Sequence, residues 1–150
     1  MDSRLKRVFE QIREAWPHVV LDDVNAVNAD GDNALHWAVG CNDLEAARLL
    51  IDCGIDVNQR GDLGRTPLHE ACSLGHKDMI RLLVEHGADL YAQTEGDTPF
   101  GLARLTGHDD VCDLLRPLIR EAQTRDPQVW VRVRIAHLQR ELRRLEALLQ

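Results

Sequence analysis

Aromatic residues are scarce in this chain of 150 residues, since phenylalanine, tryptophan and tyrosine together make up 4%. The core must therefore be aliphatic, and hydrophobic residues are plentiful at 44%. No apolar run approaches the roughly 18 residues that a membrane-spanning helix needs. The charged start, MDSRLKRVFEQIREAW, lacks the apolar segment of a secretory signal. We therefore expect a cytoplasmic protein that has no contact with a membrane.

Short cysteine spacings and catalytic motifs are also absent. The four cysteines, at 41, 53, 72 and 112, are scattered, and no C-x2-C or H-x3-H pair starts a zinc site. Reduced thiols, some of them packed as small hydrophobic residues, are expected. Nucleophile-elbow, P-loop and dinucleotide-binding glycine motifs are missing as well. The sequence thus predicts no catalytic residues, no metal and no cofactor, and a protein that is not an enzyme.

The net charge of −7 is unevenly distributed along the chain. Residues 1–115 contain 10 Lys and Arg against 21 Asp and Glu, whereas residues 116–150 contain 8 Arg against 4 acidic residues. An acidic body repels phosphate backbones, so nucleic acid is not an expected partner.

One segment of the sequence recurs. Thr66 to Asp89, TPLHEACSLGHKDMIRLLVEHGAD, matches NALHWAVGCNDLEAARLLIDCGID 33 positions earlier and TPFGLARLTGHDDVCDLLRP 32 positions later. Thr66 can cap a helix that Pro67 begins, Gly75 breaks it, and a second helix follows over about 76–86. Helices this short are unstable alone, so each unit must be stabilised by stacking on its neighbours.

These units resemble the ankyrin repeat family, through TPLHEA, its weaker copies NALHWA and TPFGLA, and the 33-residue period. The resemblance implies an all-α ankyrin-repeat solenoid of helix–turn–helix units with projecting β-turns at 28–32, 61–65 and 94–97. It covers residues 23–116, with repeats at about 28–60, 61–93 and 94–116 after the tail of a degenerate leading repeat. In the family, the histidines at positions 36 and 69 tie a turn to its helix, a role that Gly101 cannot fill.

Both ends differ from the repeats. In the first region, residues 1–22, apolar residues recur at helical spacing from Leu5 to Ile12, which predicts a capping helix ending at Trp16-Pro17. The helical extension over residues 117–150 should bend near Pro117 and then begin an amphipathic helix at Asp126.

Within the 129–149 helix, apolar residues alternate by four and three positions, as in the seam of a coiled coil. They are Val131, Ile135, Leu138, Leu142, Leu145 and Leu149. Such a helix can cap the last repeat, associate with itself or a partner, or stand apart, and spacing does not separate these three possibilities.

The resemblance also implies a binding site on the concave side, formed by the turn tips and first helices. We predict a partner protein with a basic surface around an apolar anchor, for which this protein acts as an adaptor or an inhibitor. Two alternatives are that the acidic tips only keep the chain soluble, and that the chain is a structural unit forming a homo-oligomer through the 129–149 helix. The predicted partner-binding residues are Asp30, Asp32, Trp37, Cys41, Asp62, Leu63, Arg65, Ser73, Leu74, Glu95, Asp97 and Leu105.

Overall fold

The computed structural model describes residues 3–19, 23–94 and 96–149. Over these residues it contains helices and turns, no strand, and one isolated antiparallel bridge between Val27 and Asn33. The predicted all-α solenoid is confirmed. Its elements are α1 (Ser3–Ala15), α2 (Ala34–Gly40), α3 (Leu44–Asp52), the 3₁₀ turn η1 (Asp62–Gly64), α4 (Pro67–Leu74), α5 (Lys77–Glu85), α6 (Pro99–Leu105), α7 (Asp109–Arg125) and α8 (Val129–Leu148).

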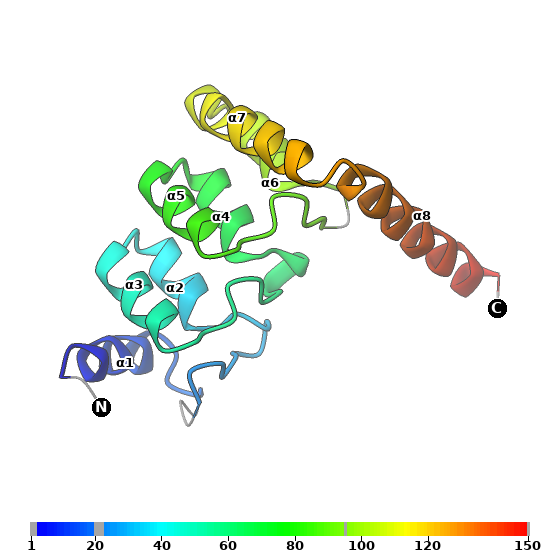
Figure 1. Ribbon diagram of the computed structural model, residues 1–150. Helices are drawn as coiled ribbons and strands as arrows, with labels where there is room; N and C mark the ends of the chain where they lie inside the picture. Colours follow the sequence, from blue (N-terminus) through cyan, green and yellow to red (C-terminus); the bar gives the residue numbers. More distant parts are fainter. Residues whose placement is uncertain (1–2, 20–22, 95, 150) are drawn as a thin grey trace. The chain divides into compact units, whose positions relative to one another are not determined.

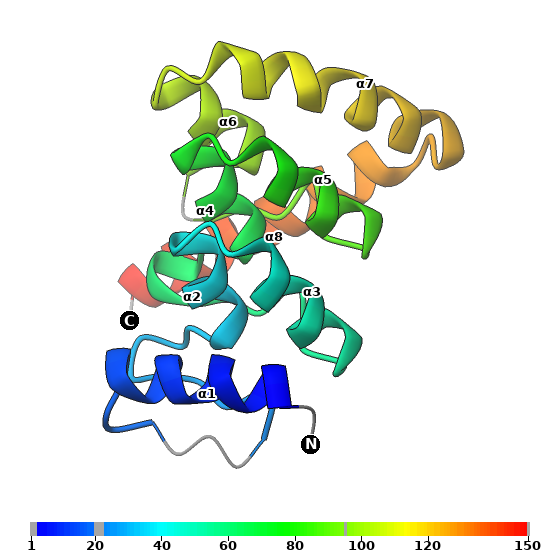
Figure 2. The ribbon, with the colours of Figure 1, turned by 90° about the vertical axis from the view of Figure 1, so that its left-hand side faces the viewer.

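The chain divides into two compact units, residues 1–112 and 113–150. In the first unit, α2 packs on α3 and α4 on α5, so each pair is one helix–turn–helix repeat. Neighbouring repeats stack through α2 on α4, α3 on α5, and α4 on α6. The first helices α2, α4 and α6 therefore form one row and the second helices α3 and α5 another, as Figures 1 and 2 show.

The helices begin at the predicted capping residues. The Asn33 side chain accepts hydrogen bonds from the backbone N–H groups of Leu35 and His36, and Thr66 and His69 cap α4 reciprocally. These bonds satisfy backbone donors that the first helical turn leaves unpaired. At the other end of α4, Gly75 adopts the left-handed conformation with φ +76° and stops the helix.

The core between the repeats is aliphatic, as predicted. Leu35, Leu50, Leu68, Ile80 and Leu83 have no exposed surface. Burying side chains of this size contributes about 1.5–3 kcal/mol each. Helices of only 7 to 9 residues are thereby held in place by stacking.

Helix α1 covers the first repeat with the predicted apolar face. Leu5, Val8 and Ile12 are buried, and the helix contacts α3. Arg4 lies 3.9 Å from a carboxylate oxygen of Glu45 in an exposed ion pair. Such pairs contribute at most about 1 kcal/mol, so the apolar face is the main attachment of α1.

The thiols fall into two groups. Cys72 and Cys112 are buried, whereas Cys41 and Cys53 are exposed. Burial raises the pKa of the Cys72 thiol to about 12, which makes it unreactive at neutral pH.

In the second unit, α7 continues through Pro117 to Arg125. The predicted boundary between residues 116 and 117 therefore falls inside a helix. Helix α8 begins at Val129, slightly later than the predicted start at Asp126, whose carboxylate accepts the backbone N–H of Gln128 at 3.1 Å. None of the helices in the described residues has the length and apolar content to cross a membrane.

Candidate functional site

The first turn, residues 28–32, is closed by its own asparagine. The backbone N–H of Asn28 donates to the carbonyl of Asp32 at 2.9 Å. The Asn28 side-chain oxygen accepts from the backbone N–H groups of Asp30 and Asp32, both at 2.9 Å. This arrangement leaves the Asp30 side chain exposed at the tip.

The second turn carries an exposed leucine in a strained conformation. Gly61 N–H donates to the carbonyl of Arg65 at 2.8 Å, which closes the turn around η1. At its tip, Leu63 has φ +54° and is 67% exposed. A left-handed conformation is unfavourable for a residue with a Cβ, and an exposed leucine gains nothing from burial.

The third turn is closed by Thr94. Its backbone N–H donates to the Asp97 carbonyl at 2.9 Å, and its hydroxyl accepts the N–H of Asp97 at 3.1 Å. Asp97 is partly exposed here, whereas Glu95 lies outside the described residues. Gly101 offers no side chain to this turn.

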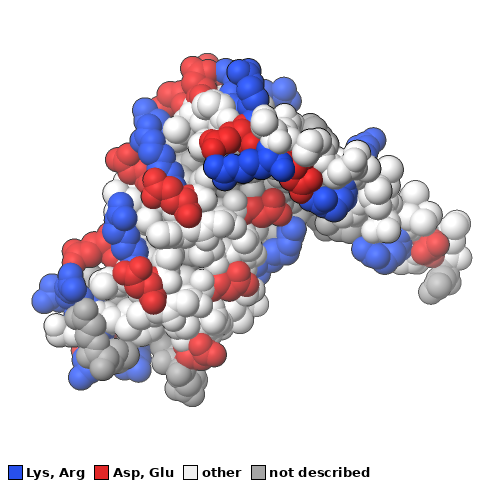
Figure 3. Space-filling view, in the orientation of Figure 1, with Lys and Arg blue, Asp and Glu red and all other residues white. Residues whose placement is uncertain are grey.

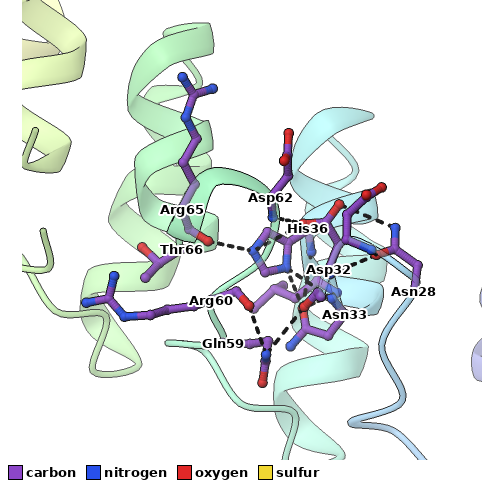
Figure 4. Close-up of polar contacts among 12 residues, drawn as sticks. Asn28, Asp32, Asn33, His36, Gln59, Arg60, Asp62, Arg65 and Thr66 are labelled. Carbon is purple, nitrogen blue, oxygen red and sulfur yellow. Dashed lines mark hydrogen bonds and ion pairs between the residues drawn. The ribbon is translucent and has the colours of Figure 1, made fainter. Parts of the chain in front are cut away.

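Two buried histidines, one in the first repeat and one in the second, each join their repeat to the turn that follows it. Nε2 of His36 donates to the Arg65 carbonyl, and Nε2 of His69 donates to the Asp97 carbonyl, each at 3.2 Å. Nδ1 of His69 accepts the backbone N–H of Thr66 at 3.1 Å, so the ring is the neutral tautomer with its proton on Nε2. Burial lowers the pKa of His69 to about 4, in agreement with this state. The scaffold role predicted for these residues is confirmed (Figure 4 shows His36).

A second pair of histidines joins each repeat to the one before it. Nδ1 of His76 lies 3.1 Å from the carbonyl of Val39, and Nε2 of His108 lies 3.0 Å from the carbonyl of Ser73. Both carbonyls belong to the last turn of a first helix, and that of Val39 also accepts the backbone N–H of Asn42 at 2.9 Å. These histidines are therefore structural too.

Asp32 has a structural role that its place in the first turn did not indicate. Its carboxylate accepts the backbone N–H of Asp62 at 3.0 Å and lies 4.0 Å from Nε2 of His36 (Figure 4). The side chain is 22% exposed. We expected a freely solvated tip, but Asp32 links the first turn to the second, whereas Asp30 and Asp62 are exposed.

The predicted apolar residues lie at the far ends of the first helices. Cys41 follows α2 and is exposed, while Leu74 and Leu105 end α4 and α6 with exposures of 44% and 67%. Helices of 7 or 8 residues separate them from the turn tips by about 10 Å. The acidic tips and this apolar row therefore lie at opposite ends of the first helices, and Trp37 in the middle of α2 is partly exposed.

Glu70, in the first turn of α4, has an unusual environment. A Cβ placed on Gly40 would be 3.3 Å from its carboxylate oxygen, so Glu70 lies over the end of α2. Burial, together with the nearby charge of Asp32 and against the opposing effect of Arg65, raises the pKa of Glu70 to about 7. The sequence places Glu70 beside the scaffold histidine but shows nothing of this perturbation.

Charge is not confined to the turns. Figure 3 shows acidic and basic side chains alternating along the edge of the repeats formed by α3 and α5. What distinguishes the turn and first-helix face is the combination of carboxylates with exposed leucines.

The comparisons with known proteins agree with this architecture. A family model described as ankyrin repeats in three copies matches residues 58–126, and one described as ankyrin repeat matches residues 30–62. The chain therefore belongs to the ankyrin repeat family, as the resemblance implied. Ankyrin repeats indicate a protein–protein interaction module.

Among its relatives are two mammalian phosphatase subunits. Protein phosphatase 1 regulatory subunit 27 from Mus musculus is 42% identical over 53% of this chain and 52% of its own length. The Homo sapiens protein is 44% identical over 51% and 50%. The chain thus spans about half the length of these relatives. Human SMC5-SMC6 complex localization factor protein 1 is 36% identical over 69% of this chain and 10% of its own length.

Proposed function

We propose that this chain is a non-enzymatic module that binds another protein through the binding face, defined as Asp30, Asp62, Leu63, Trp37, Glu70, Leu74 and Leu105. It acts as an adaptor or an inhibitor of that partner. The observation that carries the proposal is Leu63, which is exposed at the tip of the second turn with φ +54°.

The conformation of Leu63 supports an intermolecular role. A left-handed residue with a Cβ costs about 1–2 kcal/mol, and strained backbone is concentrated at functional sites. Glycine would fit the turn without that cost, and a polar residue would suit the exposure better. A leucine held in this way is suited to fill an apolar pocket on a partner.

The charges around Leu63 favour a basic partner surface. Asp30 is exposed in the first turn and Asp62 in the second, and Glu70 follows the second turn in α4. A lysine or arginine placed against Glu70 would offset the burial and the like charge that raise its pKa. Complementary charge of this kind accelerates encounter and selects the partner.

Protein phosphatase 1 is the first partner to test. Two relatives are named as its regulatory subunits and match this chain over half of their length. Regulation of a phosphatase also agrees with the adaptor or inhibitor role.

The test measures binding of purified protein phosphatase 1 catalytic subunit to the full chain by biolayer interferometry. A tip variant, Asp30→Lys with Asp62→Lys, should bind at least tenfold more weakly and lose its salt dependence, because attraction becomes repulsion. Leu63→Gly should weaken binding about tenfold without loss of stability, since glycine adopts this φ freely and only the anchor is lost.

A matched control is Asp52→Lys with Glu85→Lys, which reverses two exposed carboxylates of the second helices. It should bind like the wild type. The binding face is wrong if this control loses binding while the tip variant keeps it. If the wild type does not bind the phosphatase, that partner is excluded, and the same variants are compared on whatever protein the wild type captures from its host.

Binding should also depend on pH through Glu70. With a pKa of about 7 the free carboxyl is partly protonated at neutral pH, whereas a partner cation would favour its ionised form. The complex then holds fewer protons than the free chain, so affinity should rise about three- to tenfold from pH 6 to pH 8. Glu70→Gln should remove this slope.

The raised pKa of Glu70 also predicts how the stability of the free chain depends on pH. Because the folded-state pKa of Glu70 lies above its unfolded value, its contribution to stability is present at acidic pH and is lost as pH rises through about 7. Glu70→Gln should therefore be more stable than the wild type at pH 8 in a urea titration. A less stable variant would contradict the assigned environment.

A further inference from the structure

Helix α8 presents an apolar seam to solvent. The seam residues Val131, Ile135, Leu138, Leu142, Leu145 and Leu149 are all about half exposed or more, from 48% at Ile135 to 88% at Leu149. Leu148 beside them is 76% exposed. Single exposed leucines are ordinary, but a continuous row along a 20-residue helix marks an interaction surface.

The spacing of the seam identifies the kind of surface that covers it. Apolar residues alternate strictly by four and three, which is the narrow stripe that one helix presents to another. A helix that lies on a membrane has a broader apolar face. The seam therefore fits a second helix.

Charged residues border the seam with opposite signs at its two ends. In the heptad labelled a to g, Ile135, Leu142 and Leu149 occupy a positions. Val131, Leu138 and Leu145 occupy d positions. Arg132 and Arg134 occupy e and g positions near the start of α8. Glu141 and Glu146 occupy g and e positions near its end.

These charges discriminate between the two ways of pairing identical helices. In a parallel pair, Glu141 of one helix would face Glu146 of the other on both sides, which is repulsive. In an antiparallel pair the e positions meet along one edge, so Arg132 of each copy faces Glu146 of the other, and Ile135 packs opposite Leu145 of that copy. The g positions meet along the other edge, where Glu141 faces Glu141 of the second copy, so two attractive pairs outweigh one repulsive pair. Arg132 also bonds Asp126 in its own chain, but a guanidinium has five N–H donors and can serve both carboxylates.

We propose that α8 pairs antiparallel with α8 of a second copy of this chain, so that the protein is a two-fold symmetric dimer. The contact is self-complementary, as two-fold symmetry requires. It does not rest on the proposed function, because it uses none of the binding-face residues. Each copy keeps its own binding face, so the dimer offers a partner two sites.

The test is sedimentation equilibrium on the full chain. Leu138→Asp should leave only monomer, because it puts a charge in the middle of the seam. Glu146→Arg alone and Arg132→Glu alone should each weaken the dimer about tenfold, since each turns two attractive pairs into two repulsive ones. A mixture of these two variants should form a heterodimer at least as tight as the wild-type dimer.

Arg143→Glu is the matched control, because position 143 is a b position on the outer side of the pair; it should leave the dimer constant unchanged. Circular dichroism checks that the repeats stay folded in every variant. A parallel dimer gives the opposite result, since Glu146→Arg would relieve its Glu–Glu contacts and tighten it. The proposal is also overturned if the wild type is monomeric at its highest soluble concentration, or if the seam instead binds phosphatidylserine vesicles.

Discussion

Replacing His69 with alanine is expected to lower the free energy of unfolding by about 3 kcal/mol, the range for a cavity and broken buried hydrogen bonds together. His69 has no exposed surface. The substitution removes the donor to the Asp97 carbonyl and the acceptor for Thr66, which lie in different repeats. A urea titration followed by circular dichroism measures the loss.

His86→Ala is the control for the same substitution at an exposed site, just after α5. Its effect should stay within about 0.5 kcal/mol. An equal loss in both variants would show that His69 does not couple the second repeat to the third turn. Because neighbouring repeats stabilise one another, the His69→Ala transition should also broaden as cooperativity between repeats declines.

Much of the fold could be predicted because its signals are local and repeated. The Thr-Pro starts, the glycine stops and the 3.6-residue periodicity lie within single helices. The scaffold histidines were recognisable because they recur in register at 36 and 69. Two short helices per repeat and the capping helix at the N-terminal end follow from these patterns.

The details of the binding face depend on contacts between repeats, which spacing within one repeat does not contain. Asp32 bonds a backbone N–H that lies 30 positions later in the sequence. The pKa of Glu70 is set by burial over α2 and by Asp32 in the preceding repeat. The positive φ of Leu63 is a property of the folded turn that nothing in the residue type indicates.

The continuation of α7 through Pro117 also depends on contacts between side chains. Pro117 removes one backbone donor, and the sequence predicts a bend there. The helix nevertheless extends to Arg125, where exposed ion pairs between Arg116 and Asp113 and between Arg125 and Glu121 lie on either side of the proline. Favourable pairs at three- and four-residue spacing support a helix that propensity alone disfavours.

Asp32→Lys should lower the free energy of unfolding by about 2 kcal/mol, although a turn aspartate would ordinarily tolerate such a change. The lysine cannot accept the N–H of Asp62, so that donor loses its partner and the first two turns lose their link. Asp30→Lys reverses an exposed carboxylate two residues away, and it should change stability by no more than about 0.5 kcal/mol. Thermal and urea unfolding of the two variants give the comparison. Equal stabilities would show that the Asp32 link contributes nothing, in which case Asp32 would belong with Asp30 and Asp62 among the charges free to meet a partner.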